Sequence, residues 1–130
     1  MKMLIAFAAT AGLFSATQAG AQSALQLRAL CRDVANGTAD AEGMVRFHIN
    51  YETGVCWGAF ASLQYLAATT LSPNETVPIL GFCAPVASTR LQFVRIFVRY
   101  VDEHPEQAQL SFTDAALLAL TAAFPCSKPQ

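Results

Sequence analysis

Cysteine is the residue type in this sequence with the most chemistry available to it. A thiol can form a disulfide, ligate a metal ion or act as a catalytic nucleophile. No two cysteines have the short spacing of a metal-binding knuckle, and only two histidines, His48 and His104, accompany them. We therefore predict no metal site and no cysteine nucleophile. Two disulfides are the expected use of Cys31, Cys56, Cys83 and Cys126.

No other group of residues has the spacing of an active site. Asp102, Glu103 and His104 are consecutive in a predicted helix, where neighbouring side chains diverge by about 100° and cannot converge on one atom. The chain has no phosphate-binding loop and no plausible serine, histidine and aspartate constellation. We therefore predict a protein that is not an enzyme and has no catalytic residues, no bound metal and no cofactor.

The N-terminal residues have the pattern of a Sec-type signal peptide. Lys2 precedes an apolar run from Met3 to Phe14, and small residues follow up to Ala21. The run is about a dozen residues, shorter than the roughly 20 that a membrane-spanning helix needs. We expect cleavage of residues 1–21 after Ala21, export to the periplasm and no membrane anchor in the mature domain, residues 22–130. An oxidising destination favours disulfides between the cysteines.

The charge of the mature chain argues against nucleic-acid binding. Without residues 1–21 the chain has 109 residues, with seven basic and nine acidic side chains and a net charge of −2. Competition for phosphate groups needs a strongly basic face. We therefore expect a single small domain whose partner is another protein.

Hydrophobic periodicity predicts an all-α protein, a small disulfide-bonded bundle of four to five helices. The first helix is expected at about residues 23–34 and the second, which is largely apolar and buried, at about residues 51–71. Residues 41–50 fit either a short helix or an extended segment, and this choice stays open. Gly58 and Ser62 share one face of the second helix. They either admit a closely packed neighbour or only weaken the helix.

Two later helices have clear start signals. Thr89 precedes Gln92 by three residues, the spacing of a capping box, and Pro105 ends the helix that follows. Ser111 and Asp114 repeat the capping pattern. The helix after them is apolar on all sides, so we expect it at the centre of the bundle.

The third helix and the loop before it have more apolar surface than one contact needs. Apolar side chains cover about 220° of residues 91–101, whereas a surface helix packs on its core with a stripe of little over 100°. We expect the excess around Phe93, Ile96 and Tyr100 to be covered by a second element or by another molecule. Loop residues 77–82 are also unusually apolar. They either fold onto the core or meet a partner.

Helix directions select one of the three ways to pair four cysteines. If helices joined by short loops are antiparallel, Cys31 near the end of the first helix faces Cys56 near the start of the second. Cys83 before the third helix likewise faces Cys126 after the fourth. We predict the disulfides Cys31–Cys56 and Cys83–Cys126.

Several motifs in the chain form a recognisable pattern. They are Cys56-Trp57-Gly58, Cys83-Ala84-Pro85, Thr89 with Gln92, Tyr100-Val101, His104-Pro105-Glu106 and Phe124-Pro125-Cys126. The pattern resembles the Rap/Tai family of periplasmic immunity proteins, which neutralise peptidoglycan amidases delivered by type VI secretion. The resemblance is best from Cys83 to Cys126.

The resemblance implies an all-helical protein, often a homodimer, that plugs the active-site cleft of a cognate amidase so that the cell wall is spared. It transfers no catalytic residue, because the family inhibits by binding. It also transfers no contact residue, because the contacts vary with the effector. The alternative is a small periplasmic chaperone or envelope stress protein, also short, helical and disulfide-bonded, which would expose apolar surface on acidification.

Candidates for partner contact come from the residues themselves. Tight protein association is usually centred on aromatic or arginine side chains. The residues that fit this chemistry, or that belong to the apolar excess, are Trp57, Ile79, Phe82, Phe93, Arg95, Arg99 and Tyr100. Each also has an ordinary explanation as a core residue or a solvated side chain.

Overall fold

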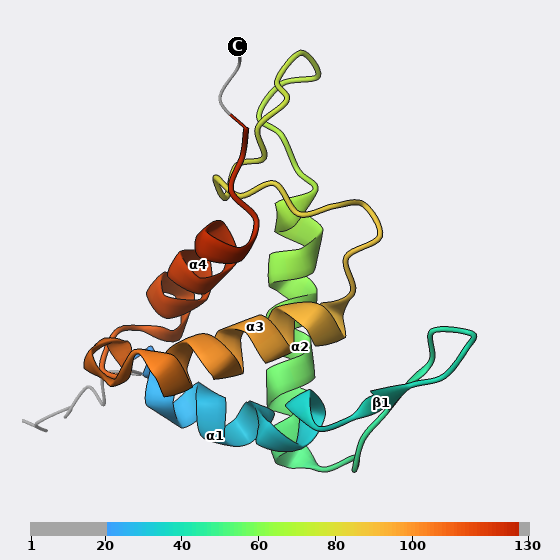
Figure 1. Ribbon diagram of the computed structural model, residues 1–130, viewed down its shortest axis with the longest axis vertical. Helices are drawn as coiled ribbons and strands as arrows, with labels where there is room; N and C mark the ends of the chain where they lie inside the picture. The colour runs from blue at the N-terminus through green and yellow to red at the C-terminus, as the bar shows by residue number, and fades with distance from the viewer. Residues whose placement is uncertain (1–20, 128–130) are drawn as a thin grey trace, which may run out of the picture.

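The computed structural model of the protein describes residues 21–127 and confirms the all-α prediction (Figure 1). The predicted signal peptide lies outside the described residues, except for Ala21. None of the described helices is long and apolar enough to cross a membrane. The elements in chain order are α1 (Ala24–Ala35), β1 (Thr38–Ala39), β2 (Val45–Arg46), α2 (Tyr51–Ala67), α3 (Arg90–Glu103), the short 3-10 helix η1 (Pro105–Gln107) and α4 (Phe112–Ala123).

Each α-helix begins at a polar side chain that accepts a hydrogen bond from a backbone N–H of the first turn. Thr89 and Ser111 cap α3 and α4, which confirms both predicted starts. Ser23 and Asn50 cap α1 and α2 in the same way, although these two caps were not predicted. A cap of this kind stabilises a helix by about 1 kcal/mol. The four caps therefore help to determine where the helices begin.

The α-helices cross one another and do not all lie in antiparallel hairpins. α1 and α3 run side by side in opposite directions, and α2 crosses both of them, as Figure 1 shows. α3 contacts α1, α2 and α4, so most of its wide apolar arc is covered by its own chain. The α3 residues buried in these contacts are Leu91, Phe93, Val94, Phe97 and Val101.

Two expectations about the apolar helices are wrong. α4 is not the centre of the bundle, because it is buried on one side only and Leu118 is exposed on the other. α2 ends at Ala67, not near Leu71, and it too is buried on one side only. Much of the apolar composition of α4 is alanine, which has little surface to remove from water. Outside its own helix, no described atom lies within 4 Å of a Cβ placed on Gly58, so no helix packs closely there.

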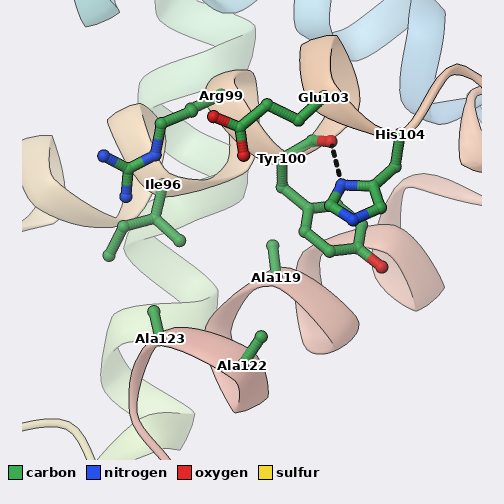
Figure 2. A pocket seen from close by; sticks show the side chains of 8 residues that line it. All are labelled: Ile96, Arg99, Tyr100, Glu103, His104, Ala119, Ala122 and Ala123. Atoms are coloured by element: carbon green, nitrogen blue, oxygen red, sulfur yellow. Dashed lines mark hydrogen bonds between the residues drawn. The ribbon is translucent and has the colours of Figure 1, made fainter.

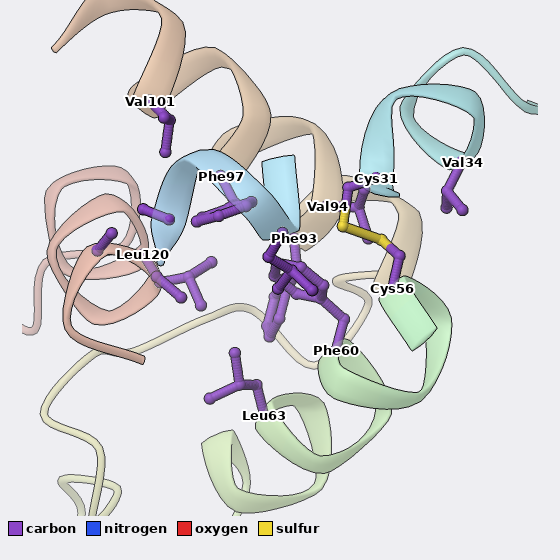
Figure 3. Packing of buried hydrophobic residues seen from close by; sticks show 14 of the residues in the cluster. Cys31, Val34, Cys56, Phe60, Leu63, Phe93, Val94, Phe97, Val101 and Leu120 are labelled. Carbon is purple, nitrogen blue, oxygen red and sulfur yellow. A yellow bond between two sulfur atoms is a disulfide. The ribbon is translucent and has the colours of Figure 1, made fainter. Parts of the chain in front are cut away.

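The core is built around phenylalanine rings from different helices (Figure 3). Phe60 of α2, Phe97 of α3 and Phe112 of α4 form a triangle whose ring centroids are 5.4 to 5.5 Å apart. Tilted and edge-to-face contacts of this kind add to the free energy of burying the rings. Leu27 and Val34 extend the core into α1. The triangle holds α2, α3 and α4 to one another.

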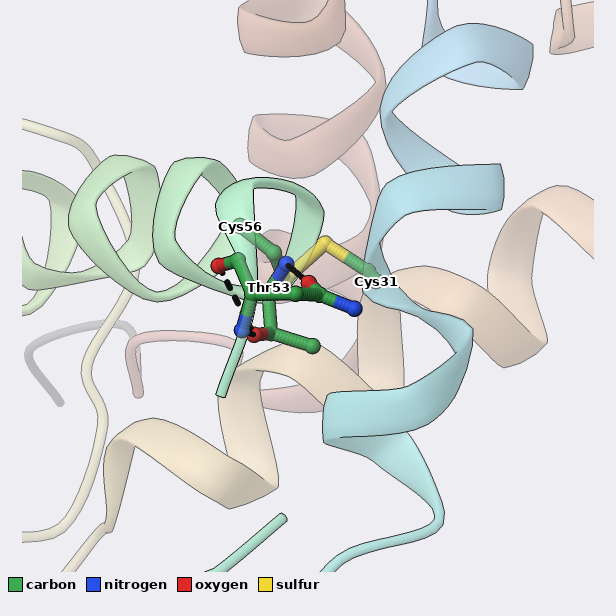
Figure 4. Close-up of a disulfide and its surroundings, with 4 residues drawn as sticks. Cys31, Thr53 and Cys56 are labelled. Carbon is green, nitrogen blue, oxygen red and sulfur yellow. Dashed lines mark hydrogen bonds between the residues drawn. A yellow bond between two sulfur atoms is a disulfide. The ribbon is translucent and has the colours of Figure 1, made fainter. Parts of the chain in front are cut away.

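Both predicted disulfides are confirmed. Cys31–Cys56 joins α1 to α2 where the two helices meet, with 5.1 Å between the Cα atoms. Both cysteines are fully buried, and Thr53 is buried beside them (Figure 4). Cys83–Cys126 joins the segment before α3 to the chain after α4. The pairing is right although α1 and α2 cross, because crossing helices can also bring two cysteines together at their point of contact.

The apolar loop at residues 77–82 is divided between core and surface. Phe82 is 0% exposed and packs edge-to-face on Phe93, with 5.8 Å between ring centroids. Ile79 in the same loop is 39% exposed. One part of the loop therefore folds onto the core, and another part remains exposed on the surface.

Residues 41–50, for which the sequence allowed either a short helix or an extended segment, are extended and contain β2. β1 and β2 pair antiparallel, with Thr38 opposite Arg46 and Ala39 opposite Val45. Gly43 in the connecting turn has a φ of 81°, a conformation that favours glycine. The resulting hairpin projects away from the helices (Figure 1).

Reduction of the disulfides should remove much of the stability of the fold. Their sequence separations are 25 and 43 residues, for which chain entropy gives about 3.5 and 4 kcal/mol, against a typical total of about 5 to 15 kcal/mol. We expect the thermal transition, followed by circular dichroism, to lose much of its cooperativity in strong reductant. An unchanged melting temperature would contradict this expectation.

Two glycine-to-alanine substitutions should have opposite effects on stability. At Gly37 a Cβ would meet the carbonyl oxygens of Arg46 and Val34 at 2.8 and 3.0 Å, so Gly37→Ala must displace the base of the hairpin. At Gly58 the space is open, and alanine favours the helix by about 0.5 to 1 kcal/mol. We expect Gly37→Ala to lower the midpoint of urea unfolding and Gly58→Ala to raise it. A lower midpoint for Gly58→Ala would mean that a neighbour packs on this glycine after all.

Candidate functional site

The seven residues predicted for partner contact do not form one surface. Phe82 and Phe93 are 0% and 1% exposed, so they cannot contact a partner in this fold, and these two predictions are wrong. Their rings fill the space between α3 and the loop that precedes it. Arg95, Arg99 and Tyr100 all lie on α3 and remain at least partly accessible.

Trp57 is half-buried and already has two partners within the protein. Its ring lies 5.2 Å from the ring of Phe47, and the guanidinium of Arg90 lies 4.6 Å from its centroid. Trp57 therefore connects α2 to the chain after the hairpin and to the start of α3. Ile79 is exposed on its loop, where its N–H donates to the carbonyl of Thr69 at 2.8 Å.

A continuous surface follows the outward side of α3. Residues three or four apart on a helix share one side, and on this side the residues from Gln92 to Glu103 are exposed or half-buried. We call this surface the α3 face. Its residues are Gln92, Arg95, Ile96, Arg99, Tyr100 and Glu103.

Arg95 has a structural role within the α3 face. Its Nε donates to the carbonyl of Ala35 at 2.9 Å, and a terminal nitrogen donates to the carbonyl of Gly37 at 2.6 Å. Ala35 is the last residue of α1, and Gly37 directly precedes the hairpin. A cation is favourable at a helix C-terminus. Arg95 therefore joins α3 to the base of the hairpin, and its guanidinium is only partly available to a partner.

A cavity of about 260 Å³ lies at the C-terminal end of the α3 face, between α3 and α4 (Figure 2). Ile96 and Tyr100 line it from α3, and alanines of α4 line it from the other side. The Tyr100 ring stacks on the His104 ring, with 4.2 Å between centroids. His104 Nδ1 donates to the carbonyl of Tyr100 at 2.9 Å. This stack restrains the tyrosine at the edge of the cavity.

The charges near the cavity differ in their availability. Asp102 pairs with Arg28 of α1, so its carboxylate is used within the protein. Arg99, at the rim of the cavity, forms no ion pair with any described residue. An exposed arginine beside an aromatic and an aliphatic side chain is the composition found at the centre of many protein interfaces.

The chemistry of the α3 face is suited to binding. Glu103 and His104 border the cavity but are consecutive in the chain, so they point in different directions. Within residues 21–127, no group of three histidine, cysteine, aspartate or glutamate side chains could hold a metal ion. What the face offers is an apolar hollow with an arginine at its edge.

Part of this site was missed in the prediction of contact residues. Ile96 was placed in the apolar excess of this helix but not among the contact candidates, and Glu103 has the helical spacing of Arg99 and Tyr100, so periodicity alone could have placed it on the same face. The alanines of α4 could not be found in this way, because only the tertiary fold brings α4 against α3. They are Ala119, Ala122 and Ala123.

Comparison with known proteins identifies the family of this chain. The model of the Rap1a immunity proteins matches residues 9–126. No curated protein and no solved structure matches the chain. The matched range includes the four α-helices, both disulfides and the α3 face. The protein therefore belongs to the Rap1a immunity protein family.

Proposed function

We propose that the protein is a periplasmic immunity protein that binds a peptidoglycan amidase delivered by type VI secretion and blocks its active site. The observation that carries this proposal is the family match over residues 9–126, which supports an immunity role. The same match favours immunity over the chaperone alternative. The amidase as target, and occlusion as mechanism, extend that role by the resemblance of the cysteine and capping motifs.

The periplasm is the compartment in which such a protein would meet its target. Residues 1–21 have the pattern of a signal peptide, and the two disulfides suit an oxidising compartment. An amidase that attacks peptidoglycan acts in the same space. Export would therefore bring the inhibitor to the enzyme before the wall is cut.

The α3 face is the surface we propose for partner contact. Tyr100 is half-buried and restrained by its stack on His104, so it would lose little conformational entropy on binding. Arg99 is exposed beside it. A stable interface buries about 800 Å² on each partner, which is more than the cavity alone supplies. The contact must therefore extend along α3, about 20 Å in length at 1.5 Å per residue.

Arg99→Ala should weaken binding to a cognate peptidoglycan amidase by ten-fold or more, about 1.4 kcal/mol. The side chain is exposed and has no described ion pair, so the fold should be unaffected. Arg32→Ala is the matched control, because Arg32 is an exposed arginine on α1. Isothermal titration calorimetry gives the affinity, and protection of cells that export the amidase gives the function.

The other outcomes are equally informative. Wild-type protein that neither binds the amidase nor protects cells would refute the proposed function. Binding to unrelated denatured proteins at acidic pH, without binding to the amidase, would favour the chaperone. If Arg99→Ala instead converts a homodimer to a monomer in light scattering, the α3 face is occupied by a second copy of the chain.

A further inference from the structure

The tip of the hairpin, residues 40–44, projects from the protein and contributes no side chain to the core (Figure 1). Met44 is 65% exposed, and Glu42 is exposed close to it. Val45 and Phe47, which follow, pack against the core. The hairpin thus changes from a buried base to a solvent-exposed end within a few residues.

The tip is held in one conformation by its own polar groups. The Met44 N–H donates to Asp40 Oδ1 at 2.7 Å, and the Asp40 N–H donates to the Met44 carbonyl at 3.1 Å. The Gly43 N–H donates to the Asp40 carbonyl at 3.0 Å. The Asp40 carboxylate also lies 3.5 Å from the Arg46 guanidinium. Asp40 therefore organises the turn, and the tip is formed before any partner binds.

The base of the hairpin is fixed to two helices. Arg95 of α3 donates to the Gly37 carbonyl, and Gly37 is packed so tightly that a Cβ would meet backbone at 2.8 Å. On the other side, Phe47 packs on Trp57 of α2. An arm that is anchored at its base and ordered at its tip loses little conformational entropy on binding.

We propose that the hairpin tip enters the substrate cleft of the amidase, with Met44 as its apolar contact and the α3 face against the rim of the cleft. This inference rests on the proposed function. A recessed active site is blocked by a convex element, whereas the α3 face ends in a hollow. Methionine adapts its shape to irregular apolar pockets. Arg95 belongs to the α3 face and also holds the hairpin, so one partner can contact both surfaces.

The charge of the tip also fits a cleft that binds peptidoglycan. The stem peptides of peptidoglycan carry carboxylates, so a cleft that accepts them should favour negative groups. The Asp40 carboxylate is paired with Arg46, but Glu42 forms no ion pair with a described residue. The tip therefore presents one unpaired carboxylate next to an apolar side chain, and a basic cleft is the partner surface that complements it.

The variants Met44→Asp and Glu42→Lys test this placement. Both side chains are exposed, so the melting temperature should be unchanged. We expect each variant to raise the inhibition constant by ten-fold or more for the amidase that the wild-type protein inhibits, assayed on soluble peptidoglycan fragments. Leu71→Asp is the matched control, because Leu71 is an exposed apolar residue on a different loop. It should leave the inhibition constant unchanged.

The outcomes separate this inference from the function on which it rests. If wild-type protein inhibits the amidase and both tip variants inhibit equally well, the hairpin is not in the cleft and the inference is overturned, while the proposed function holds. If a tip variant still binds the amidase but no longer excludes substrate, the inference is supported. If wild-type protein does not inhibit the amidase, the proposed function itself fails.

Discussion

Burial of α3 against three other helices is the constraint on which the rest of the structure depends. Its apolar residues extend too far around the helix for one neighbour to cover them, and α1, α2 and α4 all contact it. Two of these contacts meet at the triangle of Phe60, Phe97 and Phe112. Only the outward strip of α3 is left uncovered. The packing that builds the core therefore also defines the surface available to a partner.

The disulfides compensate for helices that have little bulk to bury. α4 buries mainly alanines, and each alanine contributes less to stability than a larger side chain would. Cys83–Cys126 fixes the chain after α4 next to the loop that places Phe82 on Phe93. The covalent bond thus keeps a long connection without regular structure against the core. A small domain with this composition depends on such cross-links more than one with larger core residues.

The caps of α3 and α4 and the pairing of the cysteines were predicted correctly from the sequence, whereas the hairpin and the packing of α4 depend on tertiary contacts and were not. Thr89 correctly predicted the start of α3, because a capping box involves only residues that are close in the sequence. The sequence did not decide the structure of the hairpin because long-range contacts hold it in place, Arg95 with Gly37 and Phe47 with Trp57. The central position expected for α4 was wrong because the prediction counted alanine as apolar without allowing for how little surface it presents.

The candidate contact residues also divide into those that local spacing could place and those that depend on the tertiary fold. Helical spacing could group Arg99 with its neighbours, but no local pattern could show that Phe82 is buried.

The residues proposed for recognition are largely separate from those that build the fold. Substitutions at exposed positions such as Arg99, Glu42 and Met44 should change stability by only a few tenths of a kcal/mol. An immunity scaffold could therefore change its partner without losing its fold. Arg95 is the exception, because its guanidinium lies on the α3 face and also bonds the carbonyls that begin the hairpin. A substitution at Arg95 would displace the hairpin and alter the α3 face together, so Arg95 is the position at which the proposed contact surfaces are most closely tied to the fold.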